Sequence, residues 1–155
     1  MPEPARILVV ANRTAATPAL IEAIRERTAR GAARFHLVVP ATSRGLHRVV
    51  DPEDSGRDAA HERLASALAV LSAAARETVT GEVGDANPLS ALEDAVHRHG
   101  FDEIIISTLS RPLSQWMRID LPAKARALGL PVTHVHPGAV QACVIERPSE
   151  PALVG

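Results

Sequence analysis

Three short runs of mostly apolar, β-branched residues stand out along the chain. They are Ile7–Ala11, Phe35–Val39 and Glu103–Ser107, and the last contains three consecutive isoleucines. Parallel strands that are covered on both faces read as nearly continuous apolar runs, because neither face meets water. These three segments therefore predict the central strands of a parallel sheet.

Two further segments mix polar and apolar positions. Thr78–Val83 alternates between the two kinds, and Val132–His136 also combines them. Successive residues of a strand point to opposite faces, so such a pattern indicates one buried face and one wetter face. We expect both segments to be edge strands.

The intervals between these strands carry the start and stop signals of helices. The start signals combine a capping residue with an early proline or a capping box: Thr17–Pro18, Ser55–Asp58, Asn87–Pro88 and Asp120 with Pro122. The stop signals are glycines: Gly31, Gly100 and Gly129. Helices and strands thus alternate, β-α-β-α-β-α-β-α-β, with right-handed crossovers expected.

This alternation predicts one α/β domain over residues 5–136. It would be a single doubly wound, Rossmann-like fold: a five-stranded parallel sheet in the order 3-2-1-4-5 with helices on both faces. Residues 40–55 form the longest connection and predict a surface loop. Residues 137–146 contain an apolar run that predicts an extra edge strand, in the same chain or across a dimer. Residues 147–155 are expected to be a flexible tail.

The composition of the chain limits the kinds of partner that the protein is expected to bind and the cell compartment in which it is expected to work. The 155 residues carry a formal net charge of -1 and only three aromatic side chains, so neither nucleic acid nor a membrane is an expected partner. One cysteine, Cys143, excludes an internal disulfide and a cysteine-based zinc cluster. No signal peptide and no membrane-length apolar run is recognisable, which predicts a cytoplasmic protein.

Ligands of open parallel sheets bind beyond the carboxyl ends of the strands, where the winding direction reverses. With the order 3-2-1-4-5, this crevice lies between the first and fourth strands. Each residue there also has a structural alternative, as a turn former or a cap of backbone groups. The candidate ligand-binding residues are Asn12, Arg13, Thr14, Ala41, Thr42, Gly84, Asp85, Ser107, Thr108, Ser110, Arg111 and Asp120.

The order of these segments resembles the universal stress protein family. Residues 7–14 look like that family's first strand, with Asn12-Arg13-Thr14 in place of Asp-Gly-Ser. Val83–Pro88 is similar to the family's turn after the third strand. Phe101–Ser107 and Gly129–Val135 follow the plan of its last third. The resemblance covers about residues 5–136 and implies the UspA-like fold of the adenine nucleotide alpha hydrolase-like class.

The ATP-binding branch of that family carries Gly-x2-Gly-x9-Gly after the fourth strand, where the glycines let backbone amides approach phosphates. Counting places these positions at Ser107, Ser110 and Asp120, so all three glycines are missing. A carboxylate at Asp120 would cap the helix start and repel phosphate, and Arg111 and Arg118 compensate only in part. The resemblance therefore implies a diverged nucleotide-type pocket that does not bind ATP in the family's usual way. The residues themselves predict no definite cofactor, and ATP or another adenine nucleotide enters only as the ligand class that the resemblance implies.

Histidine spacing gives no metal site. His97 and His99 lie two apart on a helix, so their rings point in different directions, whereas His134 and His136 share one face of a strand but lack a third ligand. His36 and His47 have no partner that the sequence identifies. Trp116 is expected to pack over the crevice, with a lid or partner contact as the alternative.

Three functional hypotheses follow. The first is a binding or regulatory module, homodimeric, with a small-molecule ligand or a regulatory protein partner and no catalytic residues. The second is a nucleotide-binding or ATP-hydrolysing enzyme of a related α/β class, in which Asp85 and Asp120 would hold Mg²⁺. The third is an interaction scaffold without a ligand. The missing glycines and the position of Asp120 count against the second hypothesis, and no nucleophile elbow, phosphate loop or Gly-x-Gly-x-x-Gly motif is recognisable. The first hypothesis is therefore preferred.

Overall fold

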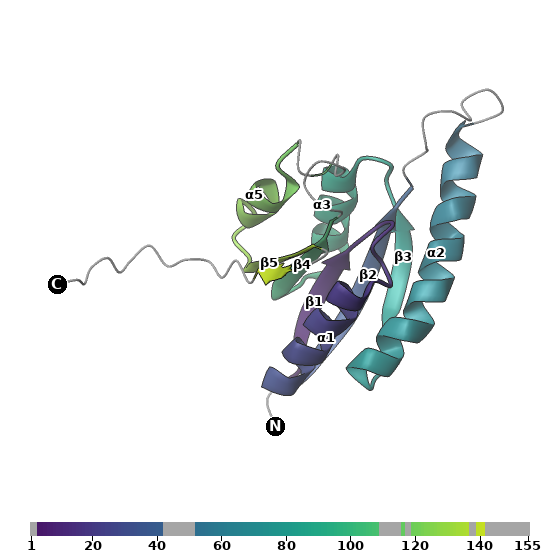
Figure 1. The fold of residues 1–155 in the computed structure, drawn as a ribbon. Coiled ribbons are helices and arrows are strands. Elements are labelled where there is room, and N and C mark those ends of the chain that lie inside the picture. The colour runs from purple at the N-terminus through teal and green to yellow at the C-terminus, as the bar shows by residue number, and fades with distance from the viewer. Residues whose placement is uncertain (1–2, 42–51, 109–115, 117–118, 137–138, 142–155) are drawn as a thin grey trace.

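The computed structural model describes residues 3–41, 52–108, 116, 119–136 and 139–141 (Figure 1). Helices and strands alternate along the chain as the sequence predicts. In chain order the elements are β1 (Ala5–Val10), α1 (Pro18–Arg30), β2 (Ala33–Pro40), α2 (Pro52–Ala75), β3 (Thr80–Gly84), α3 (Pro88–His99), β4 (Glu103–Ser107), α5 (Leu121–Arg126), β5 (Val132–His136) and β6 (Ala139–Gln141).

The strands of the described residues form one sheet in the order β3-β2-β1-β4-β5-β6. The first five are parallel, which confirms the predicted order, and β6 runs antiparallel to β5 with Val135 opposite Val140. The prediction that β5 forms an edge is wrong, because β6 of the same chain pairs with it. The edges of the sheet are therefore β3 and β6.

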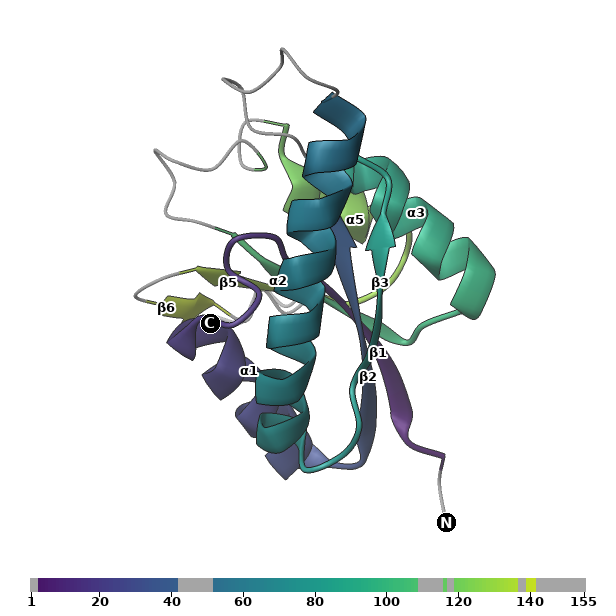
Figure 2. The same ribbon diagram turned by 90° about the vertical axis from the view of Figure 1, so that its right-hand side faces the viewer.

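The helices cover both faces of the sheet, as a parallel sheet requires. Helices α1 and α2 lie on one face, and α3 and α5 lie on the other (Figures 1 and 2). Each face has its own apolar cluster, and β1 supplies both: Ile7 and Val9 belong to the first, Leu8 and Val10 to the second. All four side chains are fully buried, which explains why this strand has no polar position among them.

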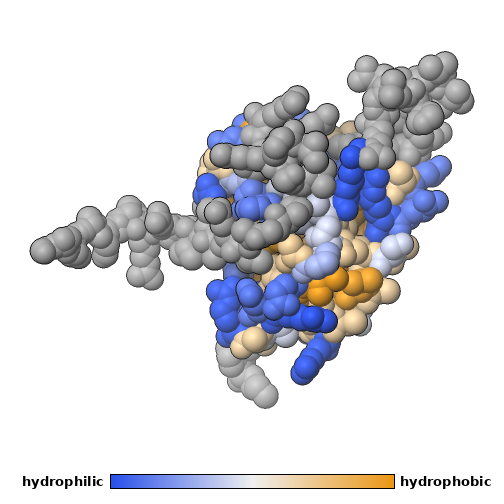
Figure 3. Space-filling model, in the orientation of Figure 1, coloured by the Kyte–Doolittle hydropathy of each residue, from blue (hydrophilic) through white to orange (hydrophobic). Residues whose placement is uncertain are grey.

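On the face of α1 and α2, partly buried apolar side chains such as Ile21, Leu64 and Leu68 pack against the first cluster. Figure 3 shows an apolar strip between these two helices, flanked by hydrophilic side chains. Within the described residues, no helix is long and apolar enough to cross a membrane.

Two helices begin as the sequence predicts. The side-chain oxygen of Thr17 accepts a hydrogen bond from the Leu20 amide at the start of α1, and that of Asn87 accepts from the Leu89 and Ser90 amides at the start of α3. Each cap is followed by proline at the first helical position, where the missing N–H costs nothing.

The second helix differs from the prediction. It begins at Pro52, inside the segment 40–55 for which the sequence predicts a loop, so Ser55–Asp58 lies within the helix and does not start it. Proline again fits the first turn. The helix ends with Arg76 in the left-handed region (φ 56°), and the Glu77 amide bonds to the Ser72 carbonyl 3.3 Å away, the pattern that closes many helices. Residues 42–51 of the expected loop lie outside the described residues.

Glycines set the distance between β3 and the helices on either side. A Cβ atom at Gly81 would lie 2.6 Å from Leu64 of α2, and one at Gly84 would lie 2.8 Å from the Ala91 side chain of α3. Alternation places Glu82, between these two glycines, on the face of α3, where it contacts Arg98 and His99. The predicted alternation of this edge strand is confirmed, although β3 starts two residues later than expected.

Candidate functional site

The carboxyl ends of β1 and β4 meet at the point where the chain's winding reverses. The segment after β1 leads to α1 on one face, whereas α5, which follows β4, covers the other face. Such a divergence leaves a crevice above the two strands in doubly wound folds. The segment Asn12–Thr14 lies beside Ser107 at this position, and both Thr14 and Ser107 are buried.

A hydrogen bond joins these two segments. The Thr14 hydroxyl donates to the Ser107 carbonyl at 3.0 Å, and the Ser107 hydroxyl lies 3.5 Å from the Thr14 carbonyl. The Thr14 carbonyl also accepts from the Thr17 hydroxyl at 3.1 Å. The Thr14 hydroxyl therefore holds the turn after β1 against the end of β4.

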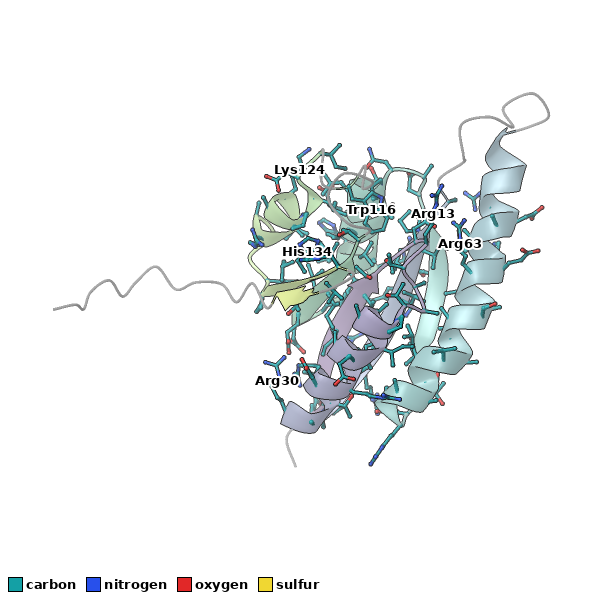
Figure 4. The ribbon with its side chains drawn as sticks, in the orientation of Figure 1. Arg13, Arg30, Arg63, Trp116, Lys124 and His134 are labelled. Atoms are coloured by element: carbon teal, nitrogen blue, oxygen red, sulfur yellow. The ribbon has the colours of Figure 1, made fainter. Side chains whose placement is uncertain are left out.

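An arginine that sequence reasoning missed belongs to this site. Arg63 of α2 donates a hydrogen bond to the side-chain carbonyl of Asn12. Arg63 is half-buried, and Arg13, next to Asn12, is exposed. Figure 4 shows Arg13 and Arg63 at the same end of the sheet, with Arg30 at the opposite end. Two guanidinium groups thus lie near the carboxyl end of β1, where they favour a negatively charged ligand.

A second buried polar pair lies on the side of β5. The Thr108 hydroxyl and His134 Nε2 are 2.7 Å apart, and the Thr108 amide donates to the Val135 carbonyl. The rings of His134 and His136 have centroids 5.5 Å apart, so these histidines share a face as predicted.

The rim residues at β2 and β3 have clear structural roles. The Ala41 amide donates to the Gly84 carbonyl at 3.1 Å, and Gly84 allows α3 to approach the sheet. A carboxylate oxygen of Asp85 accepts from the Asn87 amide at 2.8 Å, which shapes the turn before α3. These contacts fix the backbone at the carboxyl ends of β2 and β3.

The prediction that the Asp120 carboxylate caps α5 is wrong. Asp120 does occupy the cap position, but its side chain makes no capping hydrogen bond and is exposed. Its backbone is left-handed (φ 54°, ψ 49°), whereas a capping side chain needs an extended residue. This is the conformation that glycine adopts without strain, at the position where counting the Gly-x2-Gly-x9-Gly spacing from Ser107 would place the third glycine.

The remaining predictions concern Trp116, the proposed Mg²⁺ pair and several residues that the structure does not describe. Trp116 is buried and packs in the second apolar cluster with Leu8 and Val10 (Figure 4). Neither Asp85 nor Asp120 belongs to a three-ligand cluster among the described residues. Several residues named from the sequence lie outside the described ones, namely Thr42, His47, Ser110, Arg111, Arg118 and Cys143.

Comparison with known proteins agrees with this architecture. No family model and no curated protein sequence matches the chain. Among solved structures, a protein of the universal stress protein family from Burkholderia pseudomallei aligns with a TM-score of 0.60 at 18% identity, over 84% of this chain and 94% of that one. A universal stress protein in complex with cAMP aligns with a TM-score of 0.55 at 17% identity, over 85% and 97%. The chain therefore has the universal stress protein fold.

The bridge between the two strand ends is the hydrogen bond from the Thr14 hydroxyl to the Ser107 carbonyl, and removal of that hydroxyl tests it. Thr14→Val keeps the shape of the side chain but leaves the buried Ser107 carbonyl without its donor. We expect the free energy of unfolding to fall by about 1–2 kcal/mol. Ser107→Ala removes only the long 3.5 Å contact and should cost less than half as much. Urea denaturation measures both, and equal stability of Thr14→Val and the unaltered chain would contradict the bridge.

Proposed function

We propose that this chain is a universal-stress-protein-like binding module whose ligand is a small anionic adenine nucleotide in the crevice between β1 and β4. The observation that carries the proposal is the contact between Arg63 of α2 and Asn12 after β1, beside the exposed Arg13. It brings two cationic side chains and an amide to the reversal point of the sheet. Guanidinium groups bind phosphate through paired hydrogen bonds, and an amide suits a sugar or base.

A ligand with a single phosphate fits this site better than ATP. The Ser107 hydroxyl faces the Thr14 carbonyl, and the exposed carboxylate of Asp120 stands where the ATP-binding family members have glycine. A negative charge there opposes a triphosphate, whereas the arginines lie on the β1 side. One structural neighbour was solved in complex with cAMP, an adenine nucleotide with one phosphate.

The module would act by regulation and without chemistry. Ligand binding would shift the population of a form that a partner recognises, which needs no catalytic group. Asp85, one of the two residues that an Mg²⁺-dependent enzyme would use, instead shapes the turn before α3. We also propose that the protein works in the cytoplasm, in line with its single cysteine.

The ligand proposal is tested by calorimetric titration of the full chain with cAMP and with ATP and Mg²⁺. We expect cAMP to bind more tightly than ATP. Arg13→Gln and Arg63→Gln should each weaken cAMP binding by about tenfold or more, because each removes a charge-assisted hydrogen bond.

Arg30→Gln is the matched control. Arg30 is also exposed, but it lies at the opposite end of the sheet (Figure 4), so its loss should leave cAMP binding unchanged. Absence of cAMP binding, or an equal effect of all three substitutions, would contradict the proposed crevice.

We further propose that the module is a homodimer that pairs through β6. Within the described residues, β6 has a strand neighbour on one side only, so the backbone groups of its other side are available to a second copy. Two copies of one edge strand pair naturally about a two-fold axis. Light scattering after gel filtration should give twice the chain's 16.4 kDa, and a monomer mass at tens of micromolar would refute the dimer.

A further inference from the structure

Three polar side chains converge on the α3 face of the sheet, away from the crevice. His36 comes from β2, Glu82 from the edge strand β3 and His99 from the last turn of α3. In the register of the sheet His36 is paired with Thr80 and Val38 with Glu82, so His36 and Glu82 are diagonal neighbours on one face. His36 is four residues from the end of β2, about 13 Å at the usual rise of a strand.

The ligand atoms of these residues are close enough to share an ion. Glu82 Oε2 lies 3.5 Å from His99 Nε2 and 3.8 Å from His36 Nε2, and one donor atom from each residue lies within 4.8 Å of the others. Zinc binds nitrogen and oxygen at about 2.0–2.2 Å, which places tetrahedral ligands about 3.3–3.6 Å apart. Small rotations of these side chains would bring them to such spacing.

The histidine from β2 is oriented as metal ligands are. His36 Nδ1 lies 2.7 Å from the Thr80 hydroxyl, so one ring nitrogen has a polar partner that fixes the ring. The other nitrogen, Nε2, is buried without a hydrogen-bond partner and faces Glu82 and His99. A buried nitrogen left in this way is costly unless something binds it.

The surroundings of these three side chains admit an ion from solvent. The Glu82 and His99 side chains are 25% and 33% exposed, which leaves a route for entry. The Phe101 ring packs against the rings of His36 and His99, and its centroid lies 6.0 Å from the centroid of each.

The Arg98 guanidinium would compete with a metal ion for the Glu82 carboxylate. Arg98 Nη1 lies 3.3 Å from Glu82 Oε2, but the Arg98 side chain is 60% exposed. An exposed ion pair of this kind contributes little, so Arg98 can turn into solvent when an ion arrives.

We propose that His36, Glu82 and His99 form a site for one divalent transition-metal ion of the zinc class. Two imidazole nitrogens and one carboxylate are a donor set that Zn²⁺ prefers, with a fourth position left for water. The ion would join the edge strand β3 to β2 and to the end of α3. Its role in this position is to stabilise the edge, independently of any ligand in the crevice.

The test is calorimetric titration of the full chain, without a histidine tag, with ZnCl₂, followed by Co²⁺ as a spectroscopic substitute. We expect one ion per chain and a thermal unfolding temperature that rises with Zn²⁺. Glu82→Gln and His99→Ala should each weaken Zn²⁺ binding at least about tenfold and abolish most of the rise. Glu82→Gln preserves the side chain's shape, so it carries the test if His99→Ala disturbs the helix end.

Two control variants separate this site from other histidines. His97→Ala removes an exposed histidine two residues earlier on the same helix, and His136→Ala removes one of the pair on β5. Neither should change Zn²⁺ affinity. The proposal is overturned if the chain binds no Zn²⁺, if Glu82→Gln and His99→Ala bind it as well as the unaltered chain, or if His136→Ala alone abolishes binding.

Discussion

The burial of β1 on all sides is the constraint from which the rest of the structure follows. Ile7 through Val10 are fully buried, with strands on either side and helices above and below. A strand in this position is central, and in this doubly wound sheet the crossover helices on its two sides, α1 and α3, lie on opposite faces. The turn Asn12–Thr14 consequently lies beside Ser107, 93 residues later in the chain than Thr14, and the Thr14 hydroxyl fixes that contact. The central position of β1 thus determines where the candidate crevice lies.

The same sheet then offers two chemically different places. At the carboxyl ends of β1 and β4, guanidinium groups of Arg13 and Arg63 favour an anion. On the α3 face near the β3 edge, His36 and its neighbours favour a cation. The two places use different strands, so occupation of one need not alter the other. This separation suits a regulatory module, in which one site can stabilise the scaffold while another responds to a ligand.

Much of the fold could be predicted because its signals are local. The apolar runs predict β1 and β4. The side chains of Thr17 and Asn87 cap the starts of α1 and α3, as the sequence predicts. The prediction that the Asp120 side chain caps α5 is wrong because a cap depends on backbone angles as well as on residue type. Arg63 and the cluster at His36 were missed for another reason: each joins residues far apart in sequence, through a helix face or a diagonal strand pair. The spacing of residues along the chain carries no signal of such contacts.

The proposed nucleotide site lies where β1 and β4 end. Amide nuclear magnetic resonance spectra of the isotopically labelled full chain, recorded during titration with cAMP, show which residues a bound nucleotide affects. We expect the largest shifts on residues 12–14, on Arg63 and on Ser107 and Thr108, while the signals of residues at the other end of the sheet, such as Arg30, stay unchanged. Unchanged spectra at millimolar cAMP, or shifts centred away from these strand ends, would contradict the proposed site.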